Sequence, residues 1–152
     1  MFLRFFLIAG LAALPSVALG EAPVLQLDQA WVRALPPTQP TTAAYVTLRN
    51  TGPEPLMVTG ATVEGAGKVE IHHTREVDGL MRMEALATLQ VEAAATLELA
   101  PGGAHLMLFD LEAMPKVGES RRLCLLLADS EPVCTDAQVR KGTGDNHQHH
   151  NH

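Results

Sequence analysis

The chain is predicted to fold as a single all-β domain, either a sandwich or a barrel of short strands. Short runs of alternating or apolar residues recur along it, and Gly, Pro, Asn or Asp interrupts them about every ten residues. Apolar residues at helical spacing are hard to find. The chain has 152 residues, and the roughly 130 that remain after an N-terminal leader are enough for one compact domain.

Each expected strand is a run of alternating or apolar residues that ends near a breaker. In chain order the expected strands are Val24–Arg33, Ala43–Arg49, Leu56–Val63, Val69–Thr74, Leu80–Ala85, Ala95–Leu99, His105–Leu111, Arg121–Ala128 and Val133–Val139. The breakers between them include Pro36-Pro37, Asn50-Thr51-Gly52-Pro53, Gly65-Ala66-Gly67, Asp78-Gly79 and Pro101-Gly102-Gly103. The stretch Leu86–Ala94 is expected to hold a helical turn, because Ala, Leu, Gln and Glu favour helix.

Residues 1–20 are expected to be a signal peptide. A short basic start up to Arg4 precedes the apolar run Phe5–Ala18, and Ala18-Leu19-Gly20 offers small residues for cleavage before Glu21. The run is short for a membrane span, and no later segment is long enough. The mature chain is therefore expected to be exported, with no direct membrane insertion. An uncleaved N-terminal anchor is the alternative.

The charge balance excludes one class of partner. The formal net charge is −6, and loss of Arg4 with the leader would bring it near −7. No basic stripe with interleaved aromatic residues is present, so nucleic acid is not an expected partner.

Composition changes abruptly at Lys141, and residues 141–152 are predicted to form a flexible tail after a domain that spans 21–140.

Four residues form a candidate metal site: His72, Met83, His105 and Met107. Ten residues separate the first two, twenty-one the next two, and one the last two. Soft thioether ligands select Cu(I), whereas carboxylates and water suit harder ions. The donor set therefore predicts a copper site, although Ag(I) shares the same preference.

The strand pattern predicts that these residues lie on common faces. A two-residue turn at Asp78-Gly79 would pair Thr74 with Met83 and place His72 on the same face as both, with His73 on the opposite one. His105 and Met107 are two apart on a strand, so they also share a face. Taken singly, a Met is usually core filler, and a His is usually a surface or hydrogen-bonded residue.

The four-residue spacing and its flanking residues resemble the periplasmic PCu(A)C copper chaperone family. The likeness covers roughly residues 24 to 140. The segments that carry it are Ala30-Trp31-Val32-Arg33, Pro36-Pro37, Ala44-Tyr45-Val46-Thr47-Leu48-Arg49-Asn50, Val69-Glu70-Ile71-His72, Gly79-Leu80-Met81-Arg82-Met83 and Pro101-Gly102-Gly103-Ala104-His105-Leu106-Met107-Leu108.

The resemblance implies a cupredoxin-like Greek-key β-sandwich or barrel in the periplasm. It also implies that His72, Met83, His105 and Met107 bind Cu(I) for delivery to cytochrome c oxidase assembly. The acceptor or donor would be a membrane-anchored oxidase subunit or another copper chaperone. Independently of the resemblance, His73 and Met81 are reserve candidates, which would bind the metal only in place of one of the four. No open coordination position with a nearby general base is indicated, so an enzyme is not expected.

Two further groups of residues carry open alternatives. Cys124 and Cys134 flank an expected hairpin through Asp129-Ser130 and are predicted to form a disulfide, the alternatives being free buried thiols or a redox or metal role. The tail either collects a second ion such as Cu(II) or is a purification tag, and the interrupted run favours the first. The tail histidines are His147, His149, His150 and His152.

Two other functions compete with copper carriage. A periplasmic thiol-redox protein would act through Cys124 and Cys134, although their spacing is not C-x-x-C. A β-sandwich interaction module would bind metal only incidentally.

Overall fold

The structure is a computed structural model that describes residues 24–142, and every regular element in that range is a strand. The expected signal peptide and the four tail histidines lie outside these residues. The strands are β1 (Leu25–Arg33), β2 (Thr42–Asn50), β3 (Leu56–Val63), β4 (Ala66–Val77), β5 (Leu80–Leu86), β6 (Leu89–Val91), β7 (Thr96–Leu99), β8 (His105–Leu111), β9 (Ser120–Leu127) and β10 (Val133–Arg140).

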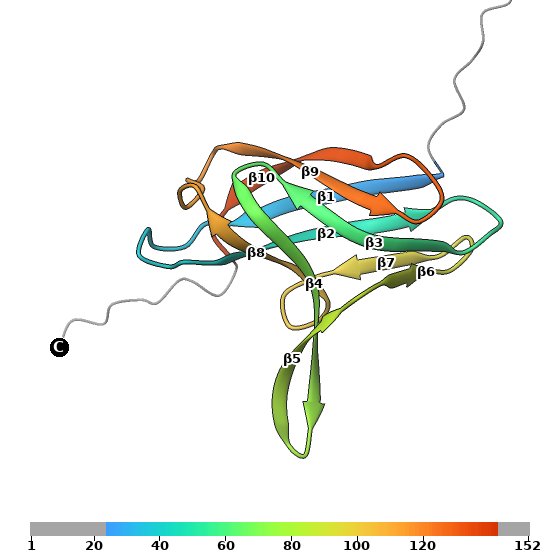
Figure 1. Cartoon of the computed structure of the whole chain (residues 1–152), viewed down its shortest axis with the longest axis horizontal. Coiled ribbons are helices and arrows are strands. Elements are labelled where there is room, and N and C mark those ends of the chain that lie inside the picture. Colours follow the sequence, from blue (N-terminus) through green and yellow to red (C-terminus); the bar gives the residue numbers. More distant parts are fainter. Residues whose placement is uncertain (1–23, 143–152) are drawn as a thin grey trace, which may run out of the picture.

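The strands form one hydrogen-bonded path that folds over on itself (Figure 1). Its order is β5-β4-β8-β2-β1-β10-β9-β3-β6, with β7 paired to β2. All neighbours are antiparallel except β1 and β10, which are parallel. Strand β3, near one end of the path, contacts β4, near the other, so the sheet encloses a core. The predicted cupredoxin-like β-sandwich is confirmed. Within residues 24–142, no helix is long and apolar enough to cross a membrane.

The core takes alternate residues from nearly every strand. On β8, Leu106 and Leu108 are almost completely buried, while His105 and Met107, which alternate with them, point to the other face. The same alternation places Ala44, Val46 and Leu48 of β2 in the core. Because one face of β8 is fixed by leucine burial, the opposite face is fixed for His105 and Met107 as well.

The segment between β5 and β7 corrects one expectation. The predicted helical turn over Leu86–Ala94 is absent, and Leu89–Val91 instead forms β6, which pairs with β3. Val91 is 1% exposed and belongs to the main core. Burial of Leu89 and Val91 against the sheet therefore outweighs the weak helix propensity of this stretch.

The turn between β4 and β5 has the predicted form. Asp78 and Gly79 have φ of 54° and 76°, so both central residues adopt the positive φ that a type I′ turn requires. Val77 consequently pairs with Leu80 and Thr74 with Met83. Strand β4 pairs with β8 only as far as His72, so the hairpin beyond it projects from the body of the domain (Figure 1).

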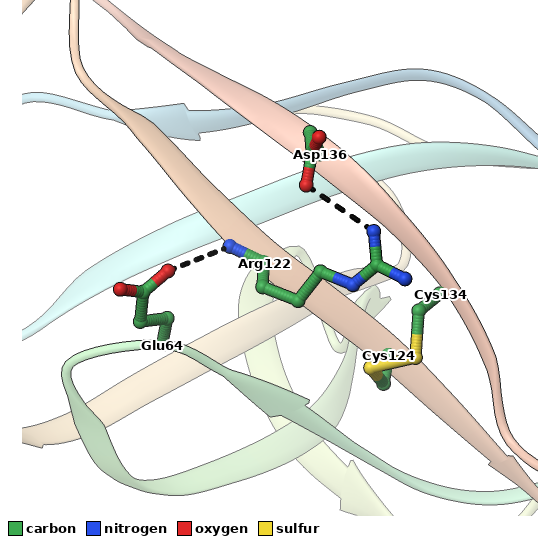
Figure 2. The surroundings of a disulfide bond; sticks show 5 residues. All are labelled: Glu64, Arg122, Cys124, Cys134 and Asp136. Carbon is green, nitrogen blue, oxygen red and sulfur yellow. Dashed lines mark hydrogen bonds and ion pairs between the residues drawn. A yellow bond between two sulfur atoms is a disulfide. The ribbon is translucent and has the colours of Figure 1, made fainter.

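Cys124 and Cys134 are joined by a disulfide between β9 and β10 (Figure 2). The two residues are directly opposite in the strand register, as a loop centred on Asp129 predicts. Both cysteines of the chain are used, so the described residues contain no free thiol. Beside the bridge, Arg122 donates a hydrogen bond to Asp136 over 3.3 Å, which also links β9 to β10.

Candidate metal centre

His72 and His105 face each other across β4 and β8. They are direct partners in the antiparallel register, and their ring centroids lie 5.8 Å apart. Residues opposite each other on antiparallel strands share a face of the sheet. The sheet path therefore brings together two histidines that are 33 positions apart in the sequence.

Three of the four predicted ligands line one pocket of about 360 Å³: Met83, His105 and Met107. Strands β5 and β8 supply these side chains, and Thr74 and Tyr45 line the pocket beside them. His72 is not among the lining residues, but it adjoins the pocket through its contact with the His105 ring. The arrangement thus gathers three predicted ligands and places the fourth directly beside them.

Met83 is the most accessible of the four residues. It is 61% exposed. It lies on β5 opposite Thr74, in the part of the β4–β5 hairpin that extends beyond the pairing of β4 with β8. Its thioether therefore presents a sulfur donor to solvent in the wall of the pocket. The thioether is also flexible, so small movements of the hairpin can bring its sulfur closer to the histidines.

His105 is held firmly from its backbone side. It is 7% exposed, and its Nδ1 lies 3.0 Å from the carbonyl oxygen of Gly103. Gly102 has a φ of 87°, which few residues other than glycine adopt, so the Pro101-Gly102-Gly103 turn can bring that carbonyl to Nδ1 of the ring. Tyr45 tilts against His105 with ring centroids 6.4 Å apart. This packing leaves Nε2 as the ring nitrogen of His105 that can serve the pocket.

His72 is held by a carboxylate instead. Its Nε2 lies 2.8 Å from Oε2 of Glu70, whereas its Nδ1 is buried without a hydrogen-bond partner. Hydrogen bonds from His72 and from Lys68 hold the pKa of the Glu70 carboxyl below its ordinary value, so Glu70 is ionised at neutral pH. Lys68, Glu70 and His72 form a line on one face of β4.

The two reserve ligands occupy different positions. His73 pairs with Glu84 and, by strand alternation, points to the face opposite His72. Met81 shares a face with Met83 but lies further out on the hairpin, opposite Glu76, and is 63% exposed. Neither residue lines the pocket that contains Met83, His105 and Met107.

Sequence reasoning missed three neighbours of the site: Glu70, Tyr45 and Arg33. The spacing of Glu70 and His72 in an expected strand was the signal for the first, because residues two apart share a face. Tyr45 and Arg33 line the pocket from β2 and β1. The strands that carry them lie far from the motif in sequence, so no local pattern could have placed them there.

Gly142, the last described residue, lies against the side chain of Arg33. A Cβ built on Gly142 would come within 2.9 Å of Nε and Nη2 of Arg33, so the chain passes closely over this side chain. Arg33 lines the pocket together with His105 and Met107. The His-rich tail therefore begins beside the candidate site, although residues 143–152 lie outside the described part of the chain.

The chemistry of this set suits a soft ion. Two imidazoles and two thioethers carry no charge, and none of the four predicted ligands is a hard oxygen donor. Imidazole and thioether donors together favour a monovalent copper ion over magnesium or calcium. Met83 is exposed in the wall of the pocket, so an ion can reach this sulfur from solvent.

Comparison with known proteins identifies a family for this chain. A family model described as "Putative lipoprotein LpqE-like" matches residues 25–139. The "Putative lipoprotein Lxx21020" of Leifsonia xyli subsp. xyli is 33% identical over 131 residues, which cover 84% of this chain and 78% of that protein.

Two solved structures share the fold. The Cu(I) form of DR1885 from Deinococcus radiodurans is 32% identical, with a TM-score of 0.66 and coverage of 82% of this chain and 83% of that one. The apo PCuAC domain from PmoF1 has a TM-score of 0.67 at 24% identity, covering 80% of this chain and 98% of that domain. The chain therefore belongs to the LpqE-like family, within the PCu(A)C copper chaperones that its sequence resembles.

Proposed function

We propose that this copper chaperone binds one Cu(I) ion through His72, Met83, His105 and Met107. The observation that carries the proposal is the pocket shared by Met83, His105 and Met107, with His72 opposite His105 in the strand register. Two histidines and two methionines satisfy the coordination preference of Cu(I) without a thiolate. The Cu(I)-loaded relative DR1885, at 32% identity, supports copper as the cargo.

The ligand set favours carriage over permanent storage. Neutral ligands add no attraction between opposite charges, so an acceptor can replace them one at a time. Met83 is exposed on β5, in the hairpin that projects from the domain (Figure 1), and is the ligand that an acceptor would reach first. His105 is buried and would be released last.

The acceptor we propose is a membrane-anchored subunit of cytochrome c oxidase, or another copper chaperone that serves it. We also propose that the chain is exported to the periplasm and cleaved before Glu21. The "Putative lipoprotein" descriptions of the matching family and of the Leifsonia protein support an exported protein.

A transfer experiment tests this function. The mature chain, loaded with one equivalent of Cu(I), is mixed with the apo, soluble copper domain of an oxidase subunit, and the two are separated for copper analysis. We expect most of the copper to move to the acceptor. If the acceptor stays free of copper while the chain keeps its ion, delivery to the oxidase is wrong even though binding stands.

Replacing both Cys124 and Cys134 with Ser separates carriage from thiol-redox activity. Loss of the bridge is expected to lower the free energy of unfolding by about 2–3 kcal/mol in the chain-entropy model, measured by chemical denaturation. Cu(I) affinity and transfer should be unchanged, because the disulfide joins β9 to β10 and none of the four ligands lies on those strands. Folded protein that no longer delivers copper would favour the redox function instead.

The tail is proposed to collect Cu(II) beside the main site. Gly142 lies against Arg33 in the wall of the pocket, and the five residues from there to His147 span at most about 17 Å. Deleting residues 145–152 should abolish binding of a second equivalent, as Cu(II), and leave the first equivalent, as Cu(I), unaffected. Unchanged binding of the second equivalent in calorimetry would contradict the proposal.

A further inference from the structure

The two histidines of the site are held by opposite ring nitrogens. In His105 the nitrogen engaged by the protein is Nδ1, which lies 3.0 Å from the Gly103 carbonyl. In His72 it is Nε2, which lies 2.8 Å from the Glu70 carboxylate. The two restraints come from different kinds of group, a backbone carbonyl in one case and a charged side chain in the other.

Both partners can only accept a hydrogen bond, and this fixes the proton on each ring. A carbonyl oxygen and an ionised carboxylate have no hydrogen to donate, so the engaged nitrogen must carry the N–H. In a neutral imidazole the other nitrogen then holds the free lone pair, which is the form that binds a metal. The available donor is therefore Nε2 on His105 and Nδ1 on His72.

The burial of the His72 ring agrees with this assignment. Its Nδ1 has no hydrogen-bond partner and no access to solvent, and an unsatisfied buried nitrogen is costly unless something binds it. The ring lies against His105, at a centroid distance of 5.8 Å, so the unsatisfied atom belongs to a ring that contacts a residue of the pocket.

We infer that His72 binds copper through Nδ1, that His105 binds it through Nε2, and that Glu70 is the positioning residue for His72. The inference rests on the proposed function and adds a residue outside the four-ligand motif. Glu70 holds the Nε2–H of His72 in both the empty and the loaded protein, so the ring need not turn when the ion enters. Lys68, paired with Glu70 on its other side, keeps the carboxylate in place.

Silver binding with NMR detection tests the nitrogen assignment directly. Ag(I) shares the soft preference of Cu(I), and its nuclear spin splits the resonance of any nitrogen bound to it. In the ¹⁵N-labelled mature chain with one equivalent of Ag(I), we expect splitting at Nδ1 of His72 and at Nε2 of His105. Splitting at Nε2 of His72 would overturn the assignment, because the Glu70 bond would then have to break on loading.

Variants of Glu70 test the positioning role. Glu70→Ala should lower Cu(I) affinity by about 10- to 100-fold, the usual effect of losing a partner behind a histidine ligand. Glu70→Gln keeps an oxygen that accepts from Nε2–H and should recover most of that loss. The matched control is Glu84→Gln, which removes an exposed carboxylate that pairs with Arg75 on the same hairpin and should leave affinity unchanged.

The readouts separate this inference from the proposed function. Wild-type affinity in Glu70→Ala would overturn the positioning role, as would an unchanged proportion of the Nε2–H form of His72 in the empty variant. Silver splitting at neither histidine would overturn the proposed site itself. Splitting at both histidines, with Nε2 of His72 as the donor, would overturn only the inference made here.

Discussion

Replacing His105 with alanine is expected to lower the affinity for Cu(I) by more than about 100-fold, beyond the 10- to 100-fold effect of an outer partner. His105 is the most buried of the four proposed ligands, and its ring is held by Gly103 and Tyr45, so its loss removes a donor that is already in place for the ion. Competition with a chromophoric Cu(I) chelator measures the change. The folded state should survive, because the ring lies outside the main hydrophobic core.

Two matched controls sharpen this result. His73→Ala removes an imidazole next to His72 that points to the opposite face, and it should leave affinity unchanged.

Met81 and Met83 are nearly equally exposed on the same hairpin, at 63% and 61%. Met83→Ala should weaken binding strongly and Met81→Ala only slightly. Equal effects from the two methionines would show that the hairpin attracts copper without a defined sulfur ligand.

Replacing Leu106, the residue next to His105, with alanine should lower the stability of the fold and leave the affinity for Cu(I) nearly unchanged. Leu106 is fully buried in the main core, and truncating such a leucine to alanine costs about 2–5 kcal/mol through lost burial and the cavity left behind. That is a large part of the 5–15 kcal/mol that stabilises a typical domain. Chemical denaturation of Leu106→Ala measures the loss, and Val117→Ala, at a position that is 58% exposed, is the control.

Copper binding by Leu106→Ala is the informative comparison. Because side chains alternate on β8, Leu106 points away from the face that carries His105 and Met107. At a temperature where the variant is still folded, its affinity for Cu(I) should stay within a fewfold of the wild type. A loss as large as that of His105→Ala would mean that the site depends on the core more closely than this alternation allows.

Much of the candidate site was predictable because it depends on local geometry. The Asp78-Gly79 turn determines the pairing of β4 with β5, and that pairing places Met83 opposite Thr74 and diagonal to His72. The two-residue period of a strand does the same for His105 and Met107. The fold class followed from similar local signals, namely the frequent breakers between short apolar runs.

Local pattern could not predict that the pair His72 and Met83 meets the pair His105 and Met107. It depends on the pairing of β4 with β8, which sets His72 opposite His105 across a long stretch of intervening chain. The same limit applies to Tyr45 and Arg33, which reach the pocket from other strands. Strand β6 was missed for a related reason, since burial of Val91 against β3 is a tertiary contact.

X-ray absorption at the copper edge of the Cu(I)-loaded wild type tests the central claim most directly. The account predicts two nitrogen and two sulfur neighbours, with one sulfur lost in Met83→Ala and one nitrogen lost in His105→Ala. A first shell of nitrogen and oxygen alone, or one that stays the same in both variants, would contradict it.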